Sequence, residues 1–292
     1  MSEPPIAAPA LETVRERVDP ELARFLADRR AELAAMDPAA AVLVDELLRL
    51  VGAGGKRIRP ALCFWAHRAA GGDDGPAIVR AAAALELLHT FALVHDDVMD
   101  RTDERRGVPS THVRFAKDAP SGTDPDGYGT SVAILVGDLA AVLAERLLRT
   151  CGAPAEPLGL ALGRFDRMRE EMAAGQFLDV HGRGVGAASA RVAALKTGSY
   201  TTEGPVLIAT ALASAGPAVE GPLRVYARLV GEAFQVRDDV LDGDAGPGAP
   251  ARVNDLVSRA TGALDGAPLM AEGARALAEL AALLRLGVEG AR

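Results

Sequence analysis

The sequence is poor in the residues on which several classes of protein depend. It has two cysteines in 292 residues, too few for a disulfide framework or a four-thiolate zinc site. Aromatic residues make up only 4% of the chain, and the formal net charge is −8, so no overall basic field exists to attract nucleic acid or an anionic membrane surface. We therefore expect no nucleic-acid partner. Any anionic ligand must be bound by a local cluster of cations.

Targeting segments and lysine are also scarce. The N-terminal stretch has no basic region followed by an apolar one, and no run approaches the roughly eighteen apolar residues that cross a bilayer. We expect a cytoplasmic protein without a transmembrane segment. Cys63 and Cys151 have apolar neighbours and are predicted to be buried thiols of a reducing compartment. Only three of the 32 basic residues are lysines, Lys56, Lys117 and Lys196, which suggests that these lysines have specific tasks.

Helix-forming residues, by contrast, are abundant. Alanine, leucine, arginine and glutamate dominate, and apolar residues recur at spacings of three and four, which predicts an all-α fold. We expect a flexible arm over residues 1–18 and one domain over residues 19–292, whose first helix begins at Pro20 with Asp19 as its N-cap. Further helices are predicted near residues 38–52, 58–70, 75–101, 131–150, 157–182, 188–199, 202–215, 221–243 and 268–287.

The most informative pattern is Asp-Asp-x-x-Asp, which occurs once on the helix over 75–101 and once on the helix over 221–243. The six residues are Asp96, Asp97, Asp100, Asp238, Asp239 and Asp242. The first and last aspartates of each copy are four residues apart, so they share one helix face and repel each other. A cation relieves this repulsion. Hard oxygen ligands without a nearby thiolate favour Mg²⁺, which shares its coordination sites with substrate phosphates.

A single cluster of this kind fits a solvated acidic face equally well. Each copy, however, follows a strongly apolar stretch, LLHTFALV or VGEAFQV, where a solvated face would be out of place. Two identical clusters in such surroundings favour a site that binds metal and diphosphate.

Three groups of cations complement the aspartates. The segment Gly54–Pro60, GGKRIRP, sets three cations beside two glycines just before a helix, where the backbone can approach a phosphate. Arg105 and Arg106 follow the first cluster, and their alternative role is a favourable interaction with the helix dipole. Lys196 and Thr197 lie in a stretch otherwise free of lysine, although an ordinary surface lysine is the alternative. Together with two facing acidic helices, these cations suit a polyphosphate, and the apolar faces beside them suggest a hydrocarbon tail.

These motifs resemble those of the trans-isoprenyl diphosphate synthases of the short-chain, farnesyl or geranylgeranyl type. Five segments match in order between about residues 54 and 242: GGKRIRP, LLHTFALVHDDVMDRTDERRG, GQFLD, KTGSYT and FQVRDDVLD. The resemblance implies the isoprenoid-synthase helical bundle around a central cavity, usually as a homodimer. It also implies a prenyltransferase that condenses isopentenyl diphosphate with an allylic diphosphate, giving geranylgeranyl or farnesyl diphosphate.

The resemblance assigns one group of residues to the allylic substrate. The six aspartates would hold three Mg²⁺ ions that grip its diphosphate, with further contacts from Arg105, Lys196 and Gln235. Thr197 and Gln176 would shield the allylic carbocation that forms as pyrophosphate leaves. Stabilisation of the leaving anion would supply most of the catalysis, so no protein nucleophile is required.

A second group would bind isopentenyl diphosphate. It comprises Gly55, Lys56, Arg59, His89 and Arg106. His89 would otherwise be an ordinary core histidine, and only its place seven residues before the first aspartate cluster favours a ligand role. Asp179 would lie close to the cavity, or would be merely structural.

Product length would depend on side-chain bulk just before the first cluster. Phe91 lies five residues before Asp96 and Ala92 lies four before it. In the family that this chain resembles, one aromatic residue here typically allows C20 products, whereas two adjacent ones stop at C15, so we expect geranylgeranyl diphosphate. Simple core packing is the alternative role of Phe91.

The resemblance breaks after the second cluster. The family continues with Gly-Lys, a short spacer, Asp-Leu and Lys-x-Thr, whereas this chain reads DGDAGPGAPARVNDLVSRATGAL, with Asp-Leu but neither lysine. Arg252 and Arg259 lie nearby and keep the charge, but arginine is longer and planar and need not reach the same phosphate oxygen.

Two other functions remain open. A non-catalytic partner subunit of an active synthase is favoured by the altered motifs after the second cluster and disfavoured by the intact aspartates. A terpene cyclase would share the fold and the ionisation chemistry, but it has no need of GGKRIRP or of a second complete Asp-Asp-x-x-Asp.

Overall fold

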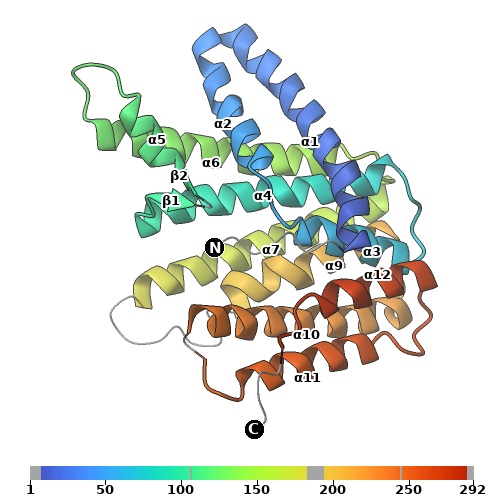
Figure 1. Ribbon diagram of the computed structural model, residues 1–292. Helices are drawn as coiled ribbons and strands as arrows, with labels where there is room; N and C mark the ends of the chain where they lie inside the picture. Colours follow the sequence, from blue (N-terminus) through green and yellow to red (C-terminus); the bar gives the residue numbers. More distant parts are fainter. Residues whose placement is uncertain (1–7, 106, 183–193, 244, 288–292) are drawn as a thin grey trace. The chain divides into compact units, whose positions relative to one another are not determined.

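The computed structural model describes residues 8–105, 107–182, 194–243 and 245–287, with the side chains of residues 194–197 left out. Between turns and loops these residues form helices, with one small antiparallel hairpin in which β1 (Glu104–Arg105) pairs with β2 (Val108–Pro109). The predicted all-α class is confirmed (Figure 1).

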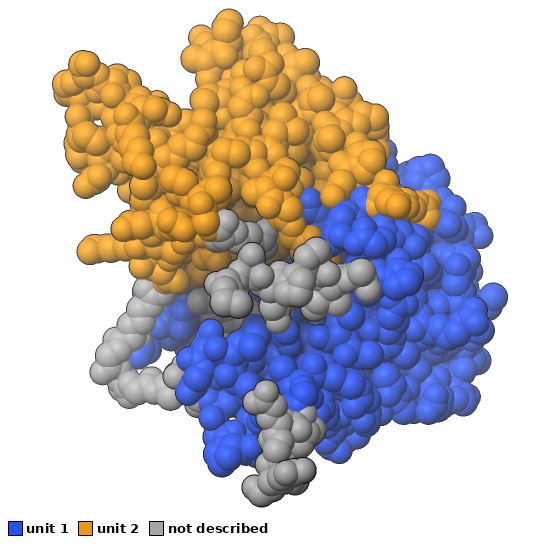
Figure 2. Space-filling view, in the orientation of Figure 1, with its two compact units in different colours: residues 1–15, 57–82, 151–292 blue, residues 16–56, 83–150 orange. Residues whose placement is uncertain are grey.

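The chain divides into two compact units, coloured separately in Figure 2. Unit 1 comprises residues 1–15, 57–82 and 151–292, and unit 2 comprises residues 16–56 and 83–150. Two long helices, α1 (Pro9–Met36) and α4 (Pro76–Asp100), run from one unit into the other. A single domain over residues 19–292 stays a prediction.

Unit 1 is built mainly around α10, which is flanked by α11 and α12 (Figure 1). Its elements are α3 (Ile58–Ala69), α7 (Ala155–Gly182), the π-helix η2 (Ala194–Glu203), α9 (Gly204–Leu212), α10 (Pro217–Asp242), α11 (Ala249–Gly262) and α12 (Ala271–Ala282). Tyr226 of α10 is fully buried, and its hydroxyl donates to the carbonyl oxygen of Leu277 at 2.6 Å. This bond ties α12 to the core, because a buried phenol needs a partner.

Unit 2 packs α6 against α2 and α5. The elements that lie wholly in this unit are η1 (Pro38–Ala40), α2 (Ala41–Gly52), the hairpin, α5 (Thr111–Lys117) and α6 (Pro125–Arg149). Pro125 occupies the first turn of α6, and the carboxylate of Asp124 accepts a bond from the Gly127 amide at 3.1 Å, which caps the helix. The core contains Leu47 of α2 and Leu87 of α4, neither of which is exposed.

The predicted start of the first helix is wrong. The helix α1 begins at Pro9 and runs through Pro20 without a break. Leu11, Val14 and Val18 are buried and continue the apolar stripe, so tertiary packing compensates for the backbone hydrogen bond that Pro20 cannot make. Residues 9–18, which were predicted to belong to a flexible arm, therefore belong to this helix.

Most other helices match the prediction, with three differences. A helix over Ala249–Gly262 was not expected, since it follows a segment rich in glycine and proline. A short helix over Thr111–Lys117 lies between the helices predicted near 75–101 and 131–150, where the sequence predicts none. The predicted helix over 188–199 falls largely outside the described residues, and its last part belongs to the π-helix η2.

The helix α4 is the one element of the described chain that is long and apolar enough to cross a membrane. Its most apolar window is 67% buried inside the protein, which is the behaviour of a core helix. Four consecutive alanines, residues 81–84, are fully buried within it. Cys63 and Cys151 are buried free thiols, as predicted, and burial raises the pKa of both.

Candidate active site

The first aspartate cluster occupies the last turns of α4. Asp97 is only 5% exposed, whereas the Asp96 side chain is 26% exposed and Asp100 is an exposed residue. The negative end of the helix dipole lies at this terminus, so three carboxylates there are unfavourable unless cations compensate them. The structure thus separates Asp97, which faces inward, from two carboxylates that solvent can reach.

Arg105, on β1, supplies one such cation. Its Nε donates to Oδ1 of Asp97 at 2.7 Å, and its Nη2 lies 2.7 Å from that oxygen and 3.9 Å from Oδ2 of Asp96. Burial lowers the pKa of the Arg105 guanidinium, but the hydrogen bond that it donates to Asp97 and the charges of all three aspartates outweigh this effect, so the pKa is raised overall. The neighbouring Arg106 lies outside the described residues.

A pocket of about 460 Å³, which includes its opening to solvent, adjoins this ion pair within unit 2. It is lined by Leu50, Ala53, Thr90, Leu93, Val94, Asp97, Arg105, Val108, Pro109 and Ser110. Most of these side chains are apolar, so the pair between Asp97 and Arg105 is less screened than it would be in water.

Glu46 of α2 is a site residue that the sequence reasoning missed. It is fully buried, and its carboxylate accepts bonds from Arg49 at 2.6 and 2.8 Å, from Thr111 at 2.8 Å and from Arg114. Thr111 and Arg114 belong to the helix that directly follows the hairpin. Glu46 therefore anchors the end of the segment that carries Arg105. The sequence offers one signal for Glu46, which is an acidic residue on the apolar face of a predicted helix.

The residues expected to bind substrate or limit product length lie further back on α4. His89, Phe91 and Ala92 are each partly buried. The Phe91 ring meets the His95 ring edge-on, with the ring centroids 4.8 Å apart, and His95 Nε2 lies 3.2 Å from the carbonyl oxygen of Ile134 on α6. Phe91 is thus held by the residue that precedes the first aspartate cluster.

The second aspartate cluster ends α10 in the same way that the first ends α4. Asp238 and Asp239 are partly buried, and Asp242 is exposed at the last residue of the helix. Gln235 donates from Nε2 to Oδ1 of Asp239 at 2.9 Å, which brings together two residues of the predicted site. Gly243 then takes a left-handed conformation, with φ of 84°, and stops the helix directly after the cluster.

The KTGSYT motif lies in the π-helix η2, and Lys196 and Thr197 have side chains outside the described part of the chain. π-Helical turns are rare and occur frequently at functional sites. The π-helix packs closely on α10, because a Cβ at Gly231 would lie 2.6 Å from Oγ1 of Thr202. Glycine at this position lets the two elements approach one another.

The GGKRIRP segment forms the turn between α2 and α3. Gly54 has φ of 88°, which favours glycine, and Arg57 adopts a left-handed conformation just before α3 and is 4% exposed. Gly55 is partly buried and Lys56 is exposed. Arg59, in the first turn of α3, donates from Nη2 to Oγ1 of Thr201 at 2.9 Å. The structure therefore joins the last part of this motif, which belongs to unit 1, to KTGSYT.

Four other residues discussed from the sequence lie elsewhere in unit 1. Gln176 and Asp179 are partly buried one turn apart on α7. Arg252 donates to Glu232 of α10 at 2.6 Å, and Arg259 lies 3.5 Å from Asp255 of its own helix. Both arginines are about 60% exposed, so they form surface ion pairs on α11.

The donor chemistry of the clusters fits Mg²⁺. Within the described residues, no group of three or more histidine, cysteine, aspartate or glutamate side chains is arranged to hold a metal ion alone. Each cluster nevertheless offers accessible carboxylate oxygens. Mg²⁺ is usually held by one or two carboxylates and completes its shell with water and substrate phosphates, so such incomplete sets suit it.

Comparison with known proteins places these features in a family. A family model described as polyprenyl synthetase matches residues 41–255. The chain is 34% identical over 218 residues to a chloroplastic geranylgeranyl pyrophosphate synthase of Catharanthus roseus, covering 69% of this chain and 57% of that protein. It is 35% identical over 197 residues to a geranylgeranyl diphosphate synthase of Methanosarcina mazei, covering 66% and 56%. The matches thus span little more than half the length of these relatives.

A solved structure gives the same picture of the fold. The geranylgeranyl pyrophosphate synthase of Corynebacterium glutamicum, complexed with isoprenyl diphosphate and magnesium, superposes with a TM-score of 0.84 at 26% identity. The match covers 94% of this chain and 98% of that one. The predicted isoprenoid-synthase bundle is therefore confirmed.

Proposed function

Since the chain belongs to the polyprenyl synthetase family, we propose that it is a short-chain trans-prenyltransferase that joins isopentenyl diphosphate to an allylic diphosphate. The observation that carries this proposal is the repeated Asp-Asp-x-x-Asp at the C-terminal ends of two long helices. Acidic residues are unfavourable at that end of a helix, so a bound cation is the simplest reason for six of them. The family match and the pairing of Arg105 with the first cluster support the same reading.

In this proposal the aspartates bind Mg²⁺ together with the allylic diphosphate, with three ions expected. Asp96 and Asp100 are the accessible donors of the first cluster, and Asp238 and Asp239 are the main donors of the second, joined by Asp242. Mg²⁺ neutralises the diphosphate and thereby makes pyrophosphate a better leaving group.

Cationic and polar residues of this chain complete the hold on the allylic substrate. Arg105, Lys196 and Gln235 contact its diphosphate and stabilise the negative charge that develops as the C–O bond breaks. Thr197 and Gln176 shield the allylic cation from water. Asp97 keeps Arg105 in place through their 2.7 Å hydrogen bond.

The homoallylic substrate, isopentenyl diphosphate, is bound by the second set. This set is Gly55, Lys56, Arg59, His89 and Arg106. Held there, its double bond attacks C1 of the allylic cation, and loss of a proton from the adduct forms the new double bond. Positioning two substrates in one site supplies a large part of the acceleration.

We propose geranylgeranyl diphosphate as the main product and farnesyl diphosphate as the alternative. Phe91 is the one aromatic residue directly before the first cluster, and its contact with His95 fixes the ring. A small residue, Ala92, follows it. Replacement of Phe91 by alanine should lengthen the product, and Ala92→Phe should shorten it to C15.

We further propose a cytoplasmic homodimer. Ile134, Leu135 and Val142 expose 43%, 54% and 61% of their surface on one face of α6, and a second copy of the chain would cover such an apolar face. Sedimentation of the wild type and of Leu135→Glu tests the dimer: the variant should sediment as a monomer.

The function is tested by incubating purified protein with Mg²⁺, isopentenyl diphosphate and each of dimethylallyl, geranyl and farnesyl diphosphate. The products are dephosphorylated and resolved by chain length. A C20 alcohol that requires both substrates supports the proposal, and C15 supports the synthase but not the Phe91 limit. Hydrocarbon from an allylic substrate alone would indicate a cyclase. No turnover by folded protein, with stimulation of an active synthase added to the assay, would indicate a partner subunit.

A further inference from the structure

Arg59 is held from two directions by consecutive residues of the π-helix. Its guanidinium carbon lies 4.3 Å from the centroid of the Tyr200 ring, and its Nη2 donates to Oγ1 of Thr201 at 2.9 Å. The ring supports the guanidinium from one side, and the hydroxyl fixes the position of one of its nitrogens. Thr201 is 1% exposed, so this bond is protected from water.

Most of the hydrogen-bonding capacity of Arg59 is left for a ligand. A guanidinium carries five N–H donors, and Thr201 takes one of them. The Nε donor is buried and has no partner within the described part of the chain. The residue as a whole is only partly buried. A planar cation oriented in this way is suited to an anion with several oxygens.

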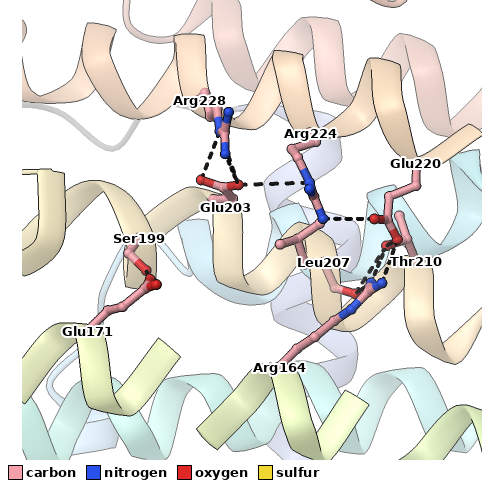
Figure 3. A network of polar contacts seen from close by, with 9 residues as sticks. All are labelled: Arg164, Glu171, Ser199, Glu203, Leu207, Thr210, Glu220, Arg224 and Arg228. Atoms are coloured by element: carbon pink, nitrogen blue, oxygen red, sulfur yellow. Dashed lines mark hydrogen bonds and ion pairs between the residues drawn. The ribbon is translucent and has the colours of Figure 1, made fainter. Parts of the chain in front are cut away.

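The segment that orients Arg59 is itself anchored at both ends. Ser199 donates to the carboxylate of Glu171 on α7, and Glu203 accepts from Nε of Arg228 on α10 at 3.1 and 3.2 Å (Figure 3). Tyr200 and Thr201 lie between these two anchors. Their side chains are therefore set by α7 and α10 as well as by their own helix.

A second group of ion pairs and hydrogen bonds holds α9, the helix that follows the π-helix. Arg164 of α7 donates to Glu220 at 2.6 Å and to the Thr210 hydroxyl at 2.9 Å, while Arg224 donates to Glu220 at 2.9 Å (Figure 3). Arg224 also lies 3.9 Å from the Glu203 carboxylate. These contacts join α7, α9 and α10 around the π-helix, which restricts its movement.

We propose that Tyr200 and Thr201 are positioning residues that orient Arg59 toward the diphosphate of the homoallylic substrate. This inference rests on the proposed function. The π-helix then serves both substrates. It carries Lys196 and Thr197, which are proposed to bind the allylic substrate, and it orients Arg59, which is proposed to bind isopentenyl diphosphate. The residues assigned to the two diphosphates are then coupled through the single π-helix η2.

The experiment compares the steady-state kinetics of the wild type with those of three variants of the residues that support Arg59. Thr201→Val keeps the shape but removes the acceptor, and Tyr200→Leu removes the aromatic face. Each should raise the KM for isopentenyl diphosphate about tenfold, leaving kcat and the KM for the allylic substrate within about twofold. Thr201→Ser restores the acceptor and should recover the wild-type KM.

Two controls separate positioning from general packing. Thr13→Val removes a hydroxyl bond of 2.9 Å from the surface of α1 and should change no kinetic constant. In an Arg59→Gln background, Tyr200→Leu should add no further rise in KM, because it acts only through the arginine. A merely structural role would instead lower kcat and raise both KM values in every variant.

The outcomes distinguish this inference from the proposed function. Unchanged KM values for isopentenyl diphosphate in Thr201→Val and Tyr200→Leu, with an active wild type, would overturn the inference alone. Calorimetric titration with isopentenyl diphosphate gives a second readout that needs no turnover. Absence of both binding and turnover in the wild type would overturn the proposed function, and the inference with it.

Discussion

The contact between α10 and the π-helix gives a prediction whose size follows from the structure. A Cβ added at Gly231 would lie 2.6 Å from Oγ1 of Thr202, whereas ordinary contacts are 3.4 Å or longer. Thr202 is not exposed at all, and its hydroxyl donates to the Gly198 carbonyl at 3.0 Å. It cannot rotate away without losing that bond, so Gly231→Ala must push the two elements apart by about 0.8 Å.

Overpacking of this kind costs about 1–3 kcal/mol. Gly163→Ala is the matched control, because Gly163 is exposed inside a long helix, α7, and its added Cβ would meet nothing within 4 Å. Both variants gain about 1 kcal/mol of helix propensity, so their difference isolates the clash. We expect Gly231→Ala to have a free energy of unfolding about 1–3 kcal/mol below that of the control. Urea denaturation measures this difference.

Activity should follow the same order. A shift of the π-helix displaces the segment that carries Lys196 and Thr197, and displacements near 1 Å can cost about a hundredfold in rate. We expect prenyl transfer by Gly231→Ala to fall at least about tenfold, while Gly163→Ala keeps the wild-type rate. Equal stability and equal activity of the two variants would refute the reasoning.

Three further predictions concern charge and pH. Asp97→Asn should lower kcat/KM about tenfold, because it weakens the charge-assisted hydrogen bond that holds Arg105. Asp96→Asn should cause a larger loss in the same Mg²⁺-dependent assay, and an equal loss would contradict the separate role of Asp97. Glu46→Gln should destabilise the protein by about 2–3 kcal/mol in urea, because it leaves two partly exposed arginines with a weaker acceptor; an effect below about 0.5 kcal/mol would contradict the role of Glu46 as an anchor. Burial lowers the pKa of His67 below its ordinary 6.5, so the unfolded chain binds more protons and stability is lost as pH falls below about 6.5. His67→Gln should flatten this slope between about pH 7.5 and 5, and an unchanged slope would show that another group titrates.

The sequence predicted the features that depend on local pattern. The all-α class followed from spacings of three and four, and the C-terminal ends of α4 and α10, which carry the aspartates, agree with the prediction to within one residue. The predicted start of α1 was wrong because Asp19 and Pro20 resemble a helix N-terminus. The apolar stripe, however, continues on both sides of Pro20 and keeps the helix intact. The helix α11 was missed for a related reason, since the glycines and prolines before it masked an apolar face formed by Val253, Leu256 and Val257.

The features that depend on distant contacts could not be predicted in the same way. Glu46 matters because Thr111 and Arg114, more than 60 residues later in the chain, meet it in the core. Equal spacing made Asp97 look like the other aspartates, but its burial and its bond to Arg105 set it apart. Only three-dimensional packing distinguishes such residues.

The central claim is that both aspartate clusters serve Mg²⁺-dependent prenyl transfer. The most direct test measures incorporation of radiolabelled isopentenyl diphosphate into farnesyl diphosphate by the wild type, Asp96→Asn and Asp238→Asn, with Mg²⁺ and with EDTA. The account predicts a C20 product from the wild type that disappears with EDTA, and a loss of at least about a hundredfold in each variant. Undiminished incorporation by either variant, or a wild-type rate indifferent to EDTA, would contradict it.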